Sequence, residues 1–189
     1  MVQALATYHA LERTDQTRAI AKFRSSAQID REVENFKAQV KNLKSPEDLY
    51  KNRRLMNFVL SAYGLDSEIN SMGRVKAALN SDITDTNSVV NRLQDRRFRE
   101  AASDLLIQAT GVSNLKLPTV ATRVVDRYVS AEYEKLLGRQ DPAIREARYF
   151  AKNIGKVTSI YDLLGDNVLR SVVTEALGLP RSLAIQPIE

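Results

Sequence analysis

The sequence predicts an all-α protein, a multi-helix array, and three observations on its 189 residues lead to that class. Apolar residues recur at steps of three and four, the spacing that places them on one side of a helix. Serine, asparagine and proline stand where helices would begin, and glycines stand where they would end. No run of alternating β-branched residues is present, so we expect no substantial sheet.

The first elements are predicted from an apolar stripe and two caps. A helix is expected from about residue 14 to residue 43. Its stripe consists of Ile29, Val33, Phe36, Val40 and Leu43. Residues 45–48 (Ser-Pro-Glu-Asp) start a short helix, because they offer an N-cap serine, a proline at the first helical position and acids near the positive end of the dipole. Asn52 caps the next helix, and Gly64 ends it.

The middle of the chain continues the helical pattern. We expect a helix over residues 67–79, a polar loop over 81–87 and a short helix from residue 87 or 88 to 93. A further helix is expected over 97–109, and Gly111 stops it.

The last third begins with an expected loop over residues 111–118. Thr119 then caps a long helical stretch that reaches about residue 137. Gly138 and Pro142 interrupt this stretch. Two alternatives follow: Asp141-Pro142 caps a new helix, or Pro142 kinks a continuous one.

The sequence also resembles itself at an offset of 114 residues. Residues 31–69 align without a gap with residues 145–183, and eleven of the thirty-nine positions are identical. The identical residues of the first copy are Arg31, Glu32, Phe36, Ser45, Asp48, Leu49, Leu55, Val59, Ala62, Gly64 and Leu65. The matched residues are helix caps, apolar stripe positions and a helix-ending glycine, which together define a helical unit. We therefore interpret the match as an internal duplication.

The duplication predicts the domain organisation. Residues 1–118 are expected to form a first helical repeat unit. Residues 119–189 are expected to form a linking helix and the start of a second, incomplete unit, and the whole is expected to pack as one globular body. Because the second copy stops shortly after Leu183, either that copy is naturally short or the chain is a fragment of a longer protein, and we favour the fragment.

The composition argues against most enzyme classes. There is no cysteine, which excludes thiolate nucleophiles and cysteine-ligated metals, and His9 is the single histidine. We interpret His9 as an exposed or packed side chain. Asp82, Asp85 and Asn87 lie close together, but they lack the EF-hand spacing and its glycine, so helix capping explains them better. We expect no catalytic residue, no cofactor and no metal.

The net charge of +5 allows an acidic partner, but charges of both signs are interleaved along the chain. Four arginines form the densest basic cluster and are the candidate interaction patch: Arg92, Arg96, Arg97 and Arg99. On one helix Arg92, Arg96 and Arg99 would share a face. Nucleic-acid binding is disfavoured, because Asp95 and Glu100 dilute the cluster and no aromatic residue is placed to stack on bases.

The sequence contains no apolar run that is long enough to cross a membrane and no recognisable secretion signal at its start. The cytoplasm is therefore the expected location, and no membrane span is expected.

Several motifs resemble those of a known family. They are Arg31-Glu32-x-x-x-Phe36, Asp48-Leu49, Ala62-x-Gly64-Leu65, Leu79-x-Ser81-Asp82 and Asn91-Arg92-Leu93-x-Asp95-x-Arg97. They are similar to an all-helical family of unknown function that occurs mainly in alphaproteobacteria and is often encoded near flagellar genes. The resemblance covers residues 19–106 and 145–179, and the sequence departs from it at Pro180, where the first copy has Asp66. It implies a helical fold and a link to flagella, and it implies no catalytic residue.

Two functions are compatible with these patterns. The first is a non-catalytic helical protein that binds other proteins, with a role in flagellar assembly or motility implied by the resemblance. The alternative is a protein that binds nucleic acid or another anionic surface through the patch from Arg92 to Arg99.

Overall fold

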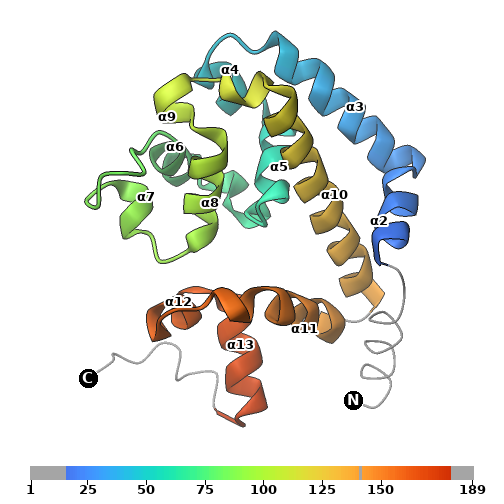
Figure 1. Ribbon diagram of the computed structural model, residues 1–189, viewed down its shortest axis with the longest axis vertical. Coiled ribbons are helices and arrows are strands. Elements are labelled where there is room, and N and C mark those ends of the chain that lie inside the picture. The colour runs from blue at the N-terminus through green and yellow to red at the C-terminus, as the bar shows by residue number, and fades with distance from the viewer. Residues whose placement is uncertain (1–15, 141, 180–189) are drawn as a thin grey trace. The chain divides into compact units, whose positions relative to one another are not determined.

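The structure is a computed structural model that describes residues 16–140 and 142–179, and every regular element within them is a helix (Figure 1). This confirms the predicted all-α class. The residues form two compact units. The N-terminal unit contains residues 16–93 and 97–133, and the C-terminal unit contains residues 94–96, 134–140 and 142–179. The division lies inside one long helix, later in the chain than the boundary expected at residue 118. His9 and Pro180 lie outside the described residues.

The predicted helix over residues 14–43 is wrong in one respect, because it is two helices. Helix α2 covers Gln16–Arg24 and α3 covers Ala27–Asn42. Between them Ser26 is extended, and the Ser25 hydroxyl donates a hydrogen bond to the carbonyl of Ala21 at 3.1 Å. Serine side chains compete in this way for backbone groups, so a Ser-Ser pair interrupts a helix that the apolar stripe alone would continue.

The two predicted caps that follow are confirmed. Helix α4 (Pro46–Lys51) begins with a full capping box between Ser45 and Asp48. Helix α5 (Arg53–Ala62) begins at Asn52, whose side chain accepts a hydrogen bond from the Leu55 amide at 3.1 Å. Gly64 follows α5 with a φ of +69°, the left-handed conformation that glycine adopts without strain.

The predicted helix over residues 67–79 is divided as well. A 3₁₀ helix, η1 (Asp66–Asn70), precedes α6 (Met72–Leu79). The loop after α6 contains two local turns, since the carboxylate of Asp82 accepts from the amide of Thr84 at 2.8 Å and that of Asp85 from the amide of Asn87 at 2.8 Å. These turns, rather than helix capping, occupy both carboxylates.

The next predicted helix, over residues 97–109, ends early. Helix α8 (Arg96–Leu105) is followed by Leu106 with a φ of +50°, and only then by α9 (Ile107–Thr110). Asn114 stabilises this break, because its side-chain amide donates hydrogen bonds to the carbonyls of Asp104 and Leu105 at 2.8 and 3.3 Å. Those carbonyls would otherwise lack partners at the helix end.

The remaining elements complete both units. They are α7 (Val89–Arg92) and the 3₁₀ helix η2 (Asn114–Lys116) in the N-terminal unit, α10 (Pro118–Gln140), which runs through both units, and α11 (Pro142–Asn153), η3 (Ile154–Lys156), α12 (Ile160–Gly165) and α13 (Asn167–Ala176) in the C-terminal unit. Gly138 does not interrupt α10. Pro142 is the first residue of α11, which agrees with the new-helix alternative.

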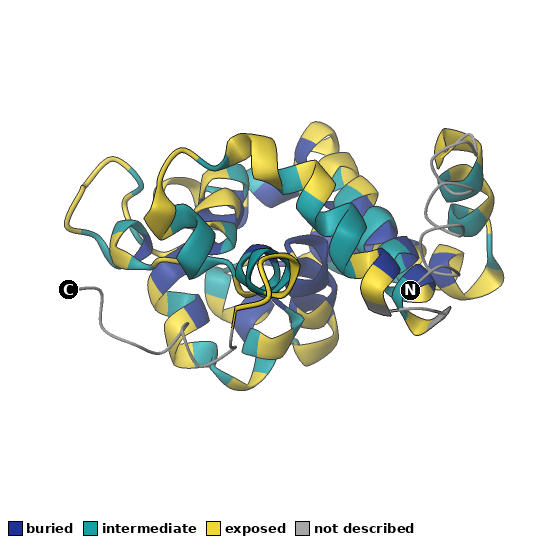
Figure 2. Cartoon of the chain, turned by 90° about the horizontal axis from the view of Figure 1, so that it is seen from below, coloured by how far each residue is buried: buried dark blue, intermediate teal, exposed yellow. Residues whose placement is uncertain are grey.

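The N-terminal unit has an extensive apolar core that joins α3, α4, α5, α6, α8 and α10 (dark blue in Figure 2). Three aromatic rings are stacked at its centre, with centroid distances of 4.3 Å between Phe36 and Phe58 and 3.8 Å between Phe58 and Tyr128. The C-terminal unit has a thin core, in which Leu137, Ile144 and Leu169 are the buried apolar residues among those described.

Candidate interaction surface

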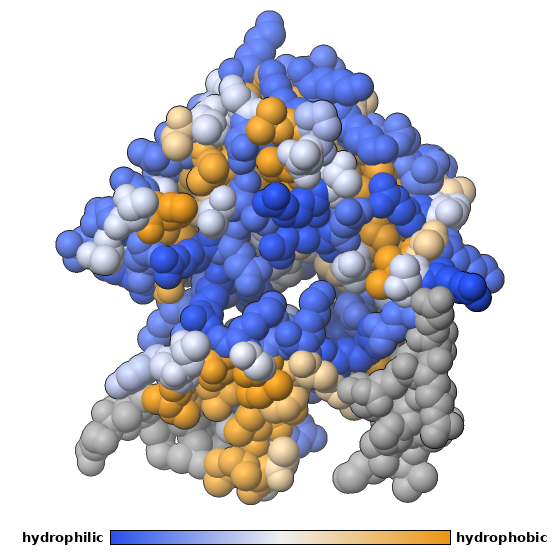
Figure 3. Space-filling view, viewed as in Figure 1, coloured by the Kyte–Doolittle hydropathy of each residue, from blue (hydrophilic) through white to orange (hydrophobic). Residues whose placement is uncertain are grey.

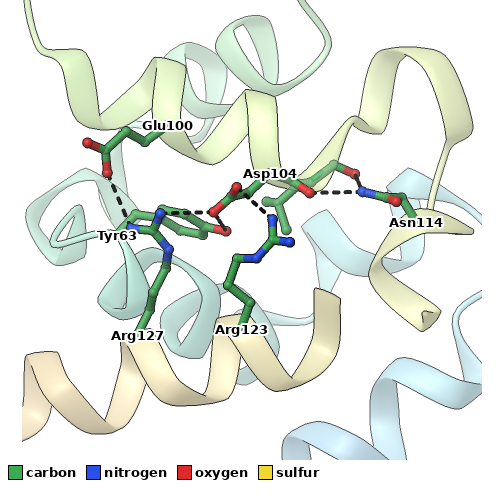
Figure 4. A network of polar contacts seen from close by, with 7 residues as sticks. Tyr63, Glu100, Asp104, Asn114, Arg123 and Arg127 are labelled. Atoms are coloured by element: carbon green, nitrogen blue, oxygen red, sulfur yellow. Dashed lines mark hydrogen bonds and ion pairs between the residues drawn. The ribbon is translucent and has the colours of Figure 1, made fainter. Parts of the chain in front are cut away.

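A polar network in the N-terminal unit is centred on the carboxylate of Asp104 (Figure 4). From α10, the Arg123 guanidinium lies 3.0 Å from one oxygen of Asp104 and the Arg127 guanidinium lies 3.1 Å from the other. Arg127 also lies 3.3 Å from Glu100 and covers the ring of Tyr63, 5.0 Å from its centroid. The network joins α5, α8 and α10, and its two cations already face two carboxylates.

Three buried tyrosines of the N-terminal unit, one of them in this network, have raised pKa values. Burial raises the pKa of Tyr63 above its ordinary value, and the neighbouring carboxylate of Asp104 raises it further. Burial likewise raises the pKa of Tyr128, and it raises the pKa of Tyr50 to about 12. These hydroxyls therefore stay protonated near neutral pH, and that of Tyr63 lies 3.3 Å from the carboxylate of Asp104.

A shallow pocket of about 240 Å³ lies beside the aromatic stack. It is lined by Glu32, Arg54, Asn57, Phe58, Ser61 and Tyr128. Arg54 pairs with both oxygens of Glu32, at 2.9 and 3.3 Å, and this partner raises the pKa of the guanidinium. The pocket's strongest charges therefore neutralise each other.

The four arginines of the predicted patch do not share one helix face. Arg92 is exposed at the end of α7, whereas the other three belong to α8. Arg97 donates a hydrogen bond of 2.6 Å to the carbonyl of Gly64. Arg96 belongs to the C-terminal unit, where it donates to the carbonyl of Lys156 at 2.8 Å and lies 3.3 Å from Asp162. Arg92 and Arg99 are exposed and make none of these contacts with Gly64, Lys156 or Asp162.

No three histidine, cysteine, aspartate or glutamate side chains within residues 16–140 and 142–179 gather closely enough to hold a metal ion. In that same part of the chain, none of the helices combines the length and the apolar character that crossing a bilayer requires.

The most distinctive surface lies on the C-terminal unit. Six large apolar side chains of this unit are exposed, and we call the five that follow α11 the C-terminal apolar surface: Ile154, Ile160, Tyr161, Leu177 and Leu179. Tyr161 is 62% exposed and Leu177 is 66% exposed. Figure 3 shows apolar side chains gathered over α12 and along α13. Large exposed apolar patches on soluble domains commonly mark sites of interaction.

The surface stands out further when it is compared with α3–α5 of the N-terminal unit. The two segments share their local geometry: Ser45 and Ser159 form the same capping box, and Gly64 and Gly178 have φ angles of +69° and +64°. After each glycine the next amide closes the helix end with a hydrogen bond of 2.8 Å, from Leu65 in one case and Leu179 in the other. These similarities are local, and the burial of the two segments is very different.

Fifteen apolar residues between Ile29 and Leu65 are buried. Thirteen of the residues 114 positions later are also apolar, the exceptions being Arg170 and Thr174. Within residues 143–179, however, Leu169 alone of these fifteen counterparts is buried.

Sequence reasoning missed this surface, although the self-similarity at an offset of 114 residues contained its signal. Tyr63 and Leu65 are 5% and 1% exposed, whereas their counterparts Leu177 and Leu179 are 66% and 42% exposed. In the N-terminal unit, α8 and α10 contact Tyr63 through Asp104 and Arg127. The described residues of the C-terminal unit include no elements that follow α13 in that way.

Comparison with known proteins gives a family and a fold. The chain is similar to protein AGR_C_984 from Agrobacterium tumefaciens, whose X-ray crystal structure superposes with a TM-score of 0.84 at 22% sequence identity, over 99% of this chain and 79% of that one. This likeness shows the fold. No curated protein sequence matches the chain. Residues 62–189 match the family described as "Protein of unknown function (DUF1217)", and because this match spans more than half of the sequence, the chain belongs to that family.

Proposed function

We propose that this protein is a non-catalytic helical factor that acts by binding protein, and that it binds through the C-terminal apolar surface. The observation that carries the proposal is the exposure of Ile154, Ile160, Tyr161, Leu177 and Leu179 on a unit with a thin core. Complete burial of a fully exposed side chain of this size contributes about 1.5–3 kcal/mol. These five are 36–66% exposed, so a partner that covers them gains part of that from each.

The proposal includes the internal duplication. If the α11–α13 segment is a second copy of the α3–α5 segment, its apolar side chains were retained for packing against further helices. The shared capping boxes at Ser45 and Ser159 and the shared glycine conformations support this interpretation. A protein partner would then supply the cover that α8 and α10 supply in the N-terminal unit.

The polar features support a non-catalytic role. Asp104 is occupied by two arginines, Glu32 is paired with Arg54, and the buried tyrosines have raised pKa values. Binding of nucleic acid through the arginine patch is the weaker alternative, because Arg96 and Arg97 donate to backbone carbonyls of this chain. A role in flagellar assembly or motility is part of the proposal and rests on the family resemblance alone. The proposed location is the cytoplasm, as expected from the sequence.

Site-specific photo-crosslinking in motile cells tests the binding role. A photoreactive residue at Leu177 should form crosslinks to protein, whereas one at Leu117 should not, because Leu117 is an exposed leucine in the N-terminal unit and serves as the matched control. Equal labelling from both positions, or none from Leu177, contradicts the proposal. The flagellar part is tested separately: deletion of the gene should reduce motility, and normal motility without a crosslinked flagellar protein would refute that part.

A further inference from the structure

We infer that the shallow pocket beside the aromatic stack binds a single organic cation, the guanidinium or alkylammonium group of an arginine-like or lysine-like ligand. Residues of α3, α5 and α10 line this pocket, and all of them belong to the N-terminal unit. The site is therefore separate from the C-terminal apolar surface and goes beyond the proposed function.

The hydroxyl of Tyr128 is the first feature that points to a ligand. Tyr128 is only 9% exposed, and its ring stacks on Phe58. Its hydroxyl makes no hydrogen bond within residues 16–140 and 142–179, yet it is not shut off from solvent, because Tyr128 lines the pocket. Hydroxyls of buried residues are normally hydrogen-bonded, so a phenol whose donor and acceptor positions face a pocket is suited to a polar ligand.

The charges around this hydroxyl favour a cation. Burial raises the pKa of Tyr128, and three neighbouring carboxylates raise it further: those of Glu132, Glu32 and Asp66. Arg54 acts in the opposite direction. Three negative groups against one positive group leave a net charge of −2 around the phenol, although the whole chain carries +5. A cation is attracted to such a site and an anion is repelled from it.

The ion pair on the pocket wall shows how a cation can be bound there. The Arg54 guanidinium donates to both oxygens of Glu32, at 2.9 and 3.3 Å, and its side chain is 55% exposed. A carboxylate has about four acceptor positions, so Glu32 can accept from a second cation as well. Exposed ion pairs contribute little to stability, so a ligand can also displace Arg54 into solvent. Arg54 therefore competes with the ligand for Glu32.

The size of the pocket limits the ligand to one small group. Its volume of about 240 Å³ is below the range of about 300–1,000 Å³ that is typical of sites for drug-sized ligands. Asn57 adds an amide that can accept a hydrogen bond from the cation, and Phe58 offers apolar contact to a methylene chain. An arginine or lysine side chain of another protein and a free small amine share this chemistry.

Two substitutions predict opposite changes in affinity for N-acetyl-L-arginine amide. Glu32→Gln should weaken binding by about tenfold or more, because it removes the carboxylate that pairs with the cation. Arg54→Gln should strengthen binding by about threefold or more, because it removes the competing cation. Both variants break the same ion pair, so a general loss of folding cannot explain effects of opposite sign.

Tyr128→Phe tests the hydroxyl while it keeps the stacked ring. It should weaken binding by about threefold to tenfold, the effect of one hydrogen bond, and leave the melting temperature unchanged. Tyr50→Phe is the matched control, because Tyr50 is a buried tyrosine of the same unit that does not line the pocket. This variant should bind like the wild type.

Titration of the full 189-residue chain, followed by ¹H–¹⁵N NMR, provides the readout. N-acetyl-L-citrulline amide is the matched ligand control, because citrulline has the shape of arginine without its charge. Binding of the citrulline compound as tightly as the arginine compound overturns the inference, as does stronger binding by Glu32→Gln. The absence of any shift with the arginine compound, n-butylguanidinium and n-butylammonium overturns it as well.

A second set of titrations distinguishes the two sources of the cation. Acetyl-Gly-Arg-Gly-amide should bind more tightly than n-butylguanidinium if the ligand is a side chain of another protein, whereas the reverse order supports a small amine. Leu177 and the rest of the C-terminal apolar surface contribute nothing to this pocket. A failure of cation binding therefore leaves the proposed function standing, and a failure of crosslinking at Leu177 leaves the cation site standing.

Discussion

At the scale of single residues, two serines perform the same task at places 114 positions apart. The hydroxyl of Ser45 accepts a hydrogen bond from the Asp48 amide at 3.2 Å, and that of Ser159 accepts one from the Asp162 amide at 3.2 Å. Each aspartate in turn accepts from the amide of its serine, at 2.9 and 3.0 Å. Both short helices therefore begin with the same reciprocal bonds. The sequence predicted the N-cap serine of the first helix, and the self-similarity aligned Ser159 with it.

The capping boxes predict a matched pair of stability losses. Ser45→Ala and Ser159→Ala should each lower the free energy of unfolding of their unit by about 1 kcal/mol, because each leaves a helix-end amide without its acceptor. Ser113→Ala is the control, since Ser113 precedes η2 without a side-chain capping bond. Denaturant unfolding followed by circular dichroism measures the losses. Equal stabilities for Ser113→Ala and Ser45→Ala would contradict the assignment.

The capping aspartates also predict an acid-dependent loss of stability. Hydrogen bonds from the Lys44 and Ser45 amides hold the pKa of Asp48 below its ordinary value of 3.8, and bonds from Thr158 do the same for Asp162. Because the folded pKa is lowered, the stabilisation is fully present above the pKa of the unfolded chain and is lost as the pH falls through the folded pKa. Asp48→Asn and Asp162→Asn should each weaken the dependence of the free energy of unfolding on pH below about pH 4. An unchanged curve would show that neither carboxylate contributes.

At the scale of elements, α10 and α11 approach closely at a glycine. A Cβ atom built on Gly138 would lie 2.7 Å from Cδ and 2.9 Å from Cβ of Arg145. The sequence suggested that Gly138 would interrupt the helix, but α10 continues through it to Gln140. The glycine is therefore explained by close packing between α10 and α11.

Gly138→Ala should consequently destabilise the C-terminal unit by about 1–3 kcal/mol, the usual cost of overpacking, although alanine favours helix. Gly155→Ala is the control in the same unit, because a Cβ atom there would meet nothing within 4 Å. Hydrogen exchange of α11 and α13 measures the change locally. If Gly138→Ala raises stability, the contact with Arg145 yields easily and the packing argument fails.

At the scale of the whole molecule, two compact units differ greatly in their cores. Leu55 and Leu169, which align at the offset of 114 residues, are both buried, 2% and 3% exposed. Leu55 lies in the extensive apolar cluster of the N-terminal unit, whereas Leu169 lies in the thin core of the C-terminal unit. A buried leucine therefore packs in a large apolar core in one unit and in a small one in the other.

Leu55→Ala should cost the N-terminal unit about 2–5 kcal/mol, and Leu169→Ala should cost the C-terminal unit less, because fewer buried neighbours surround it. Hydrogen exchange resolved by segment should show faster exchange in α3–α5 for the first variant and in α11–α13 for the second. Equal losses would indicate that the C-terminal unit is as well packed as the N-terminal one, which would also weaken the argument for its interaction surface.

The comparison of sequence and structure shows which signals are local. Ser45, Asn52, Gly64 and Gly111 marked helix ends correctly, because caps and left-handed glycines depend on neighbouring residues. The continuous helices expected over 14–43, 67–79 and 97–109 were wrong, because apolar periodicity persists across a break. At Leu106 the break depends on Asn114, which lies in a different element.

The sequence by itself determined the helical class, the caps and the self-similarity between residues 31–69 and 145–183, since all three follow from short-range patterns. Only the tertiary structure decided how those patterns are used. It separated Arg92 from Arg96, Arg97 and Arg99, surrounded Asp104 with two arginines, and covered the α4–α5 face while leaving Leu177 and Leu179 exposed. The physical reason is that burial and ion pairing depend on which distant segments pack together, and an amphipathic pattern specifies that a face is apolar without specifying what covers it.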